Sequence, residues 1–87
     1  MTFEVRWTQT SLKSLKNLDK QVQARIIERL EDLALSADPS THVKRLAGVN
    51  LYSLRVGDHR VILSIERKQM VVFVIEIGHR RNIYKKQ

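Results

Sequence analysis

The spacing of hydrophobic residues changes twice along the chain. Near the N-terminus it has a period of two, since Phe3, Val5 and Trp7 alternate with polar residues, and this predicts a β-strand. Through residues 12–34 the period is three to four, which predicts helices. Strand-like segments return after Pro39. The order of elements is therefore a strand, two helices and a group of strands.

Two helices are predicted in the first half of the chain. The first has leucines three residues apart, at positions 12, 15 and 18. The second begins at Asp19, which is a favourable N-cap residue. Its apolar face consists of residues at helical spacing: Val22, Ile26, Leu30 and Leu33. It ends before Pro39, because proline cannot continue a helix and the neighbouring Ser, Asp and Thr favour turns.

Three strands are predicted in the second half, at residues 51–56, 59–66 and 70–77. Gly57 and Asp58 separate the first two and are a two-residue hairpin signature. We therefore predict an α+β fold, in which an N-terminal strand and a helical hairpin pack on a largely antiparallel, twisted four-stranded sheet. With 87 residues, the chain has the length of a single domain that spans residues 1–87.

The strand at residues 70–77 is apolar on both alternations until Glu76. A sheet that is covered on one face normally alternates apolar and polar residues. The second face of this strand is therefore predicted to be buried by the C-terminal tail, by a partner chain, or by a central position in a small barrel-like sheet. Trp7 is predicted to pack in the core or at the edge of the sheet, and Tyr52 is predicted to face the core. His42 and His59 are predicted to be ordinary surface residues.

The positive charge of the chain is concentrated in its second half. Residues 1–43 contain six Lys or Arg and six Asp or Glu, whereas residues 44–87 contain ten and three and so carry the whole net charge of +7. This asymmetry indicates a polyanionic or acidic partner. The sequence has no apolar run of about 18 residues and no signal-peptide pattern. We therefore expect no membrane span and a cytoplasmic location, and the absence of cysteine excludes disulfides.

The predicted hairpin brings two arginines together. A two-residue loop pairs Arg55 with Arg60, so that their side chains face each other on one side of the sheet. Like charges in this position destabilise a sheet, and an anion bound between them would remove that cost. The planar fork of the guanidinium group suits phosphate. The alternative is that both side chains splay into water, towards Glu66 or Glu76.

Further basic residues flank these strands. They are Lys44 and Arg45 before the first strand, and His79, Arg80 and Arg81 after the last. These clusters can converge with the arginine pair on one groove of the sheet. Tyr84 adds a phenol that can stack on a base or move a proton, and arginine interleaved with aromatic residues is typical of RNA contact.

The sequence indicates chemistry without a bound cofactor. It has no Asp, Glu and His cluster with metal-ligand spacing and no Gly-rich phosphate loop, so we expect neither a metal nor a cofactor. RNA supplies its own nucleophile, the 2′-OH, and arginines can stabilise the charge that develops during its attack on phosphorus. A general acid and a general base each add about 10²–10⁴-fold to the rate. His79 and Tyr84 are the candidates for these two roles.

Three segments resemble the RelE toxin family of bacterial and archaeal toxin–antitoxin pairs. They are KRLAG at residues 44–48, LYSLRVGDHRVIL at 51–63 and GHRRNIY at 78–84. The resemblance covers the whole chain in element order, and it implies a small antiparallel sheet with two N-terminal helices. It also implies a metal-independent, ribosome-dependent endoribonuclease, or mRNA interferase, which cuts mRNA in the decoding site and is inhibited by a cognate antitoxin.

The resemblance also implies roles for individual residues. By position, Arg55 and Arg60 match residues that hold the scissile phosphate, Arg80 matches a transition-state arginine, and Tyr84 matches a C-terminal tyrosine near the nucleophile. The residues expected to bind RNA or the ribosome are Lys44, Arg45, His79, Arg81, Lys85 and Lys86. Ser53 departs from the pattern, because many enzyme-type members have a lysine there that can act as a base or stabilise charge.

The expected function is that of a type II toxin that inhibits translation by cleaving mRNA through attack of the 2′-OH. Its partners would be a RelB-like antitoxin, in a heterodimer or heterotetramer, and the 70S-type ribosome with its mRNA. Two alternatives remain: a ParE-like toxin that binds DNA gyrase and is not a nuclease, or an inactive homologue that only binds its antitoxin. Retention of Arg55, Arg60, Arg80 and Tyr84 favours the nuclease.

Overall fold

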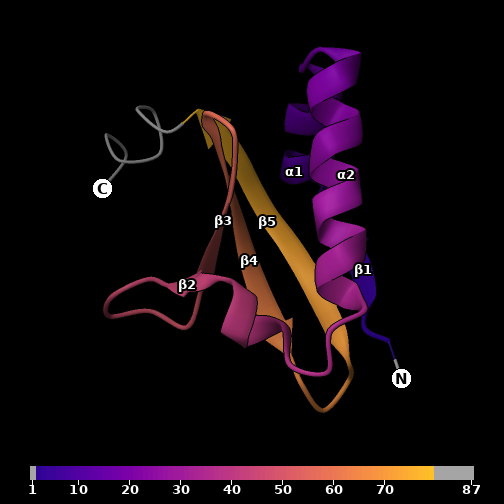
Figure 1. Cartoon of the computed structure of the whole chain (residues 1–87). Coiled ribbons are helices and arrows are strands. Elements are labelled where there is room, and N and C mark those ends of the chain that lie inside the picture. The colour runs from indigo at the N-terminus through magenta and orange to yellow at the C-terminus, as the bar shows by residue number, and fades with distance from the viewer. Residues whose placement is uncertain (1, 80–87) are drawn as a thin grey trace.

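Two helices lie against one face of a five-stranded sheet in the computed structural model, which describes residues 2–79 (Figure 1). The elements are β1 (Glu4–Trp7), α1 (Gln9–Lys16), α2 (Lys20–Ala34), the 3-10 helix η1 (Pro39–His42), β2 (Lys44–Arg45), β3 (Tyr52–Val56), β4 (His59–Glu66) and β5 (Val71–His79). The predicted α+β class is confirmed. The sheet has one strand more than predicted, because the short β2 pairs with the start of β3.

The strand order in the sheet is β1-β5-β4-β3-β2. Strands β3, β4 and β5 form the predicted antiparallel meander, and β2 is antiparallel to β3. Strand β1 is parallel to β5, which is possible because the two helices carry the chain away from β1 before the meander begins. No helix within residues 2–79 is both long and apolar enough to cross a membrane.

The second helix begins where the sequence predicts. Asp19 is the N-cap residue of α2, but its side chain makes no capping hydrogen bond. Instead, the side-chain amide of Gln23 donates to the carbonyl of Leu18 at 2.7 Å, which ties the first turn of α2 to the preceding loop. The helix ends at Ala34, and Pro39 starts η1 rather than terminating α2 directly.

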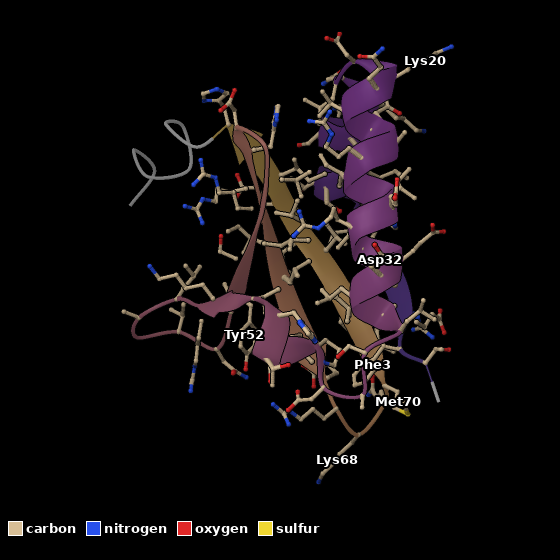
Figure 2. The ribbon with its side chains drawn as sticks, in the orientation of Figure 1. Phe3, Lys20, Asp32, Tyr52, Lys68 and Met70 are labelled. Atoms are coloured by element: carbon tan, nitrogen blue, oxygen red, sulfur yellow. The ribbon has the colours of Figure 1, made fainter. Side chains whose placement is uncertain are left out.

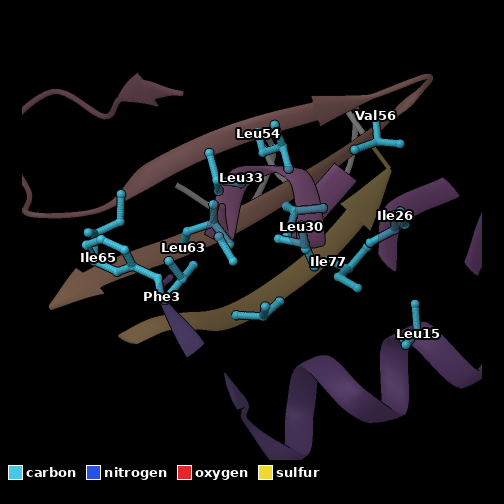
Figure 3. Close-up of a cluster of buried hydrophobic side chains, with 14 residues drawn as sticks. Phe3, Leu15, Ile26, Leu30, Leu33, Leu54, Val56, Leu63, Ile65 and Ile77 are labelled. Carbon is cyan, nitrogen blue, oxygen red and sulfur yellow. The ribbon is translucent and has the colours of Figure 1, made fainter. Parts of the chain in front are cut away.

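The core lies between the sheet and the buried stripe of α2. Figure 3 shows Ile26, Leu30 and Leu33 of this helix packed over apolar side chains of the meander. The buried residues that the sheet contributes are Leu54, Val56, Val61, Leu63, Ile65, Val72, Val74 and Ile77. They occupy one face of their strands, and the partly buried Trp7 and Tyr52 pack against them as predicted. Burial of such side chains supplies about 1.5–3 kcal/mol each.

A β-bulge in β5 explains why this strand is apolar on both alternations. Ile62 pairs with Glu76 but Leu63 pairs with Val74, so Ile75 has no partner in β4. Without this extra residue, Glu76 would share the core face with Val74. With it, Ile77 enters the core, and Glu76 turns to the opposite face of the sheet, which we call the outer face.

The outer face of β5 is also partly covered. Val71 and Ile62 point away from the helices and are nevertheless only 3% and 7% exposed. Phe73 and Ile75 are half-buried. The predicted second buried face is thus present in part in the described chain, where β5 lies between β1 and β4. The C-terminal tail, the first of the proposed covers, lies outside the described residues.

Thr8 connects the bulge to the start of α1. Its hydroxyl oxygen accepts a hydrogen bond from the backbone N–H of Ser11 at 3.1 Å, and the hydroxyl donates to the carbonyl of Ile75, also at 3.1 Å. The backbone N–H of Thr8 donates to the carbonyl of Val74. One residue therefore caps the helix and satisfies the carbonyl that the bulge leaves without a ladder partner.

We expect Thr8→Ala to lower the free energy of unfolding by roughly 0.5–2 kcal/mol, because it removes the helix cap and leaves the Ile75 carbonyl without its donor. Urea unfolding followed by circular dichroism measures this change. Thr8→Ser keeps the hydroxyl and is the matched control, which should lie close to the wild-type protein. Equal stability of the Ala and Ser variants would contradict the role of the hydroxyl.

Candidate functional site

The hairpin between β3 and β4 has the predicted register. Gly57 and Asp58 form its two-residue loop, and Gly57 has a φ of 60°, as the first central residue of a type II′ turn requires. Arg55 pairs directly with Arg60, on the outer face of the sheet. The sequence therefore predicted this like-charge pair correctly. The two arginines are backbone neighbours on the same face of the sheet.

Ser53 holds one of these two arginines. Its side chain is only 5% exposed, and its hydroxyl accepts a hydrogen bond from Nη1 of Arg60 at 3.3 Å. Arg55 is exposed, and its Nε donates to the carbonyl of Gly57 at 3.3 Å. Serine at this position therefore removes the cation that a lysine would supply, and it positions the guanidinium of Arg60 instead.

These residues line an open cavity of about 540 Å³ at the edge of the sheet. Its lining consists of Arg29, Thr41, His42, Val43, Lys44, Ser53, Leu54, Arg55 and Arg60. Four of these side chains are permanently cationic and one is an imidazole, and no Asp or Glu is among them. Glu76 lies nearby on the outer face, opposite Ile62 and diagonal to Arg60. The cavity therefore has the charge and the donors to bind an anion.

The 3-10 helix η1, which contributes Thr41 and His42 to the lining of this cavity, is held by a small polar cluster. Asp38 caps η1 and accepts hydrogen bonds from the Ser40 hydroxyl at 2.6 Å and the Ser40 backbone N–H at 3.2 Å. Arg67, in the β4–β5 turn, forms an ion pair with Asp38 at 3.3 Å and donates to Ser40. The hydrogen bond from Ser40 is the main cause that lowers the pKa of Asp38. This cluster anchors η1 and thereby places His42 and Lys44.

The structure brings some of the predicted site residues together and separates others. Lys44, Arg55 and Arg60 share the outer face and the cavity. Arg45 pairs with Tyr52 and is therefore not on the outer face but on the core face of the sheet. His79 pairs with His59 on that same face, and their rings meet edge to face with centroids 5.8 Å apart.

His79 is therefore not among the residues that line the cavity, although the sequence suggested it as a base there. The remaining predicted residues, Arg80, Arg81, Tyr84, Lys85 and Lys86, lie outside the described residues. Their roles stay predictions.

Sequence reasoning missed two residues of the cavity. His42 was expected to be an ordinary surface residue, and Arg29 was not considered. His42 is exposed as expected, yet it lines the cavity because η1 leads directly into β2. A signal for Arg29 was present, since it directly precedes Leu30 and so borders the buried stripe of α2, where long side chains reach the margin of the sheet.

The described cavity can bind and neutralise an anion. Its lining offers guanidinium forks, an ammonium group, hydroxyls and one imidazole, a set that suits a phosphodiester better than a carboxylate substrate with a bound metal. Within residues 2–79, no group of three or more His, Cys, Asp or Glu residues could hold a metal ion.

A sequence model of the family described as the ParE toxin of type II toxin–antitoxin systems, parDE, matches residues 5–84. The chain belongs to the ParE toxin family. It is thus a toxin of a type II toxin–antitoxin system, and the predicted membership of the RelE/ParE superfamily is confirmed. Among curated protein sequences, none matches the chain significantly.

Solved structures of both branches of the superfamily resemble this toxin. A chain of the RelBE2 toxin–antitoxin complex from Mycobacterium tuberculosis is 25% identical, with a TM-score of 0.82 over 92% of this chain and 93% of that one. The RelE–RelB complex from Pyrococcus horikoshii contains a chain that is 29% identical, with a TM-score of 0.76 over 92% and 97%.

The ParDE system of Pseudomonas aeruginosa shares the fold at 12% identity, with a TM-score of 0.70 over 90% and 96% of the two chains. The fold is therefore common to proteins named RelE and proteins named ParE, and it does not by itself separate the two branches.

The opposed arginines lead to a prediction about stability. We expect Arg55→Gln to raise the free energy of unfolding by about 0.2–1 kcal/mol at low salt, because it removes a like charge directly opposite Arg60. The gain should shrink as salt screens the repulsion. Urea unfolding at two salt concentrations measures both effects. Lys68→Gln, an equal charge change in the exposed β4–β5 turn, is the control. A gain of the same size in the control would contradict a local repulsion.

Proposed function

We propose that this toxin is a ribosome-dependent mRNA endonuclease. The observation that carries the proposal is the cavity at the sheet edge, where Arg55 and Arg60 lie opposite each other and Lys44 lies beside them. None of the described residues that line it is acidic. A phosphodiester placed there would receive charge-assisted hydrogen bonds from two sides. It would also reduce the repulsion between the two arginines, which are directly opposed in the sheet.

The reaction that suits this site uses the nucleophile of RNA itself. The 2′-oxygen forms a bond to phosphorus, its proton passes to a base, and the bond from phosphorus to the 5′-oxygen of the next nucleotide breaks. The leaving oxygen takes a proton, so that the products end in a 2′,3′-cyclic phosphate and a 5′-hydroxyl. Negative charge grows on the phosphoryl oxygens during the attack, and arginines aimed at them stabilise the transition state more than the ground state.

Arg60 is the described residue best placed for this stabilisation. Its guanidinium is held by Ser53 at 3.3 Å, and Arg60 belongs to β4, the central strand of the sheet. A donor that is already in position requires little reorganisation during the reaction. In this proposal Arg80 is the transition-state arginine and Tyr84 takes part in proton transfer, as the resemblance to RelE implies.

Dependence on the ribosome is expected because the described lining has few groups that can act as an acid or a base. Of the described residues that line the cavity, His42 is the one imidazole, the kind of side chain that most often acts as a general acid or base. A site rich in cations and poor in acid–base groups binds RNA well. It does little by itself to activate the 2′-OH or to align it with the phosphorus. The ribosome would hold the mRNA in the required in-line geometry, and alignment of this kind contributes several kcal/mol to a reaction.

A second candidate function is inhibition of DNA gyrase without nuclease activity. Two observations favour it: the family model that matches the chain is that of ParE toxins, and Ser53 replaces the lysine that many nuclease members have. Against it stands the arginine pair, since a surface that only binds a protein does not need two opposed cations around an open cavity.

Substitution of the arginines tests the nuclease. We expect Arg60→Gln and Arg80→Ala each to lower the cleavage rate by about 10²–10³-fold, as loss of a transition-state donor does. Each variant would be expressed in cells at a level equal to wild type, and primer extension would map the 5′ ends of mRNA. Cuts in phase with codons, lost in both variants, are the expected result.

Two controls complete this experiment. Lys68→Gln, which removes a cation at the far turn, should cleave like the wild-type protein. Arg80→Lys should recover only part of the activity, because lysine lacks the planar fork. DNA breaks with intact mRNA would establish the gyrase reading instead, and absence of both would identify an inactive homologue.

We further propose an acidic RelB-like antitoxin as the partner, since the similar toxins of M. tuberculosis and P. horikoshii are in complexes with RelB-type proteins. The outer face supports this, because the half-buried Phe73 of β5 lies on the same face of the sheet as Arg60 and Arg55. An amphipathic segment with acidic residues would cover both features, and its charge would speed association.

Hydrogen exchange tests this partner surface. We expect antitoxin binding to slow exchange in β3, β4 and β5, whereas α1 should change little, because the helices lie on the other face of the sheet. Loss of protection at residues 79–87 would show that the partner displaces the C-terminal segment, and an unchanged segment would favour steric exclusion from the ribosome. Absence of any change across residues 51–87 would refute a shared surface.

A further inference from the structure

One edge of β3 is open along more than half of its length. Strand β2 pairs only with Tyr52 and Ser53, and within residues 2–79 no strand pairs with residues 54–56 on that side. The cavity lies at this open edge, because its lining includes Leu54 and Arg55 of β3 together with residues before β2. It is therefore accessible from the outer face and from the side of the sheet that faces α2.

Helix α2 supplies a cation to this opening. Arg29 lines the 540 Å³ cavity, although its helix packs on the opposite face of the sheet from Arg55 and Arg60. Arg25, one helical turn before it, reaches the same strand edge further along. Its Nη1 atom lies 3.7 Å from the position that a Cβ atom on Gly57 would occupy. The two arginines thus follow the open edge of β3 from its middle to the hairpin.

The guanidinium group of Arg29 is not held by a direct contact within the described residues. Among the residues from 2 to 79, neither Arg25 nor Arg29 forms an ion pair or a side-chain hydrogen bond. Asp32 is one turn beyond Arg29 on the same helix. It lines a smaller cavity of about 250 Å³, which shares Arg29, His42 and Leu54 with the larger one. Arg29 lines both cavities, whereas Asp32 lines only the smaller.

We propose that Arg29, with Arg25 beside it, forms the second wall of the substrate groove and binds an RNA backbone phosphate next to the one between Arg55 and Arg60. The inference rests on the proposed RNA cleavage and adds a substrate-binding residue to it. RNA that follows the groove crosses the open edge of β3, with one phosphate on the outer face and a neighbouring one at α2. Arg29 contributes to binding and not to the chemical step.

This assignment separates two kinds of arginine by their effects. A residue that holds a flanking phosphate binds the ground state and the transition state equally well, so its loss weakens binding and leaves the maximal rate unchanged. A residue at the scissile phosphate, such as Arg60, acts more strongly on the maximal rate. Each phosphate contact to single-stranded RNA also adds about 0.7 to the slope of log K against log salt.

The experiment measures the affinity of the full chain for a single-stranded RNA oligonucleotide over a series of salt concentrations. We expect Arg29→Gln to reduce the slope by about 0.7 and Arg25→Gln/Arg29→Gln together to reduce it by up to about 1.4. Lys68→Gln removes an equal charge at the tip of the β4–β5 turn, where Figure 2 shows its side chain projecting away from the sheet, and should leave the slope unchanged. Arg29→Lys keeps the charge and should retain the wild-type slope.

Cleavage of ribosome-bound mRNA gives the second readout. For Arg29→Gln, the toxin concentration that gives half the maximal rate should rise, with the rate at saturation unchanged, whereas Arg60→Gln should lower the rate at saturation. If the wild-type protein binds and cuts RNA, but Arg29→Gln behaves like Lys68→Gln in both readouts, this inference is wrong while the proposed function stands. A wild-type protein that neither binds the oligonucleotide nor cuts ribosomal mRNA overturns the proposed function together with it.

Discussion

The two-residue turn at Gly57 and Asp58 is the constraint on which the rest of the structure depends. It sets Leu54 opposite Val61 and Arg55 opposite Arg60, so the same register assigns one set of residues to the core and the next set to the outer face. A change of loop length by one residue would exchange the two faces. Burial of the apolar residues fixes this register. The same register places Arg55 opposite Arg60, so the two like charges are opposed whenever the hairpin folds.

The sequence predicts elements that depend on local patterns better than those that depend on pairing between distant segments. The helix start at Asp19, the hairpin and the arginine pair follow from spacing and turn residues, and the structure has all three. The bulge at Ile75 could not be predicted in this way, because it depends on Thr8 far away in the sequence. The strand formed by Lys44 and Arg45 is likewise too short to produce a pattern of its own.

The candidate site was predictable only in part for a related reason. Counting charges along the sequence divides the chain into a neutral first half and a basic second half. The fold does not keep that division, because α2 brings Arg29 to the edge of a strand that belongs to the basic half. His42 was missed for the same cause, since its position depends on the anchoring of η1 by Asp38 and Arg67. Chemistry assembled across elements becomes visible only when their packing is known.

The distribution of acidic residues completes the physical picture. Glu4 forms an ion pair with Arg6 on β1, and Asp38 forms one with Arg67 of the β4–β5 turn. None of these four residues is in the lining of the cavity. Exposed pairs of this kind contribute little to stability, and none of the described residues that line the cavity is acidic. Glu76 offsets only part of the charge on the outer face. A protein that merely needed a soluble surface could spread its cations, whereas this one gathers them from α2, β2, β3 and β4 around one opening, where a bound anion would reduce their mutual repulsion.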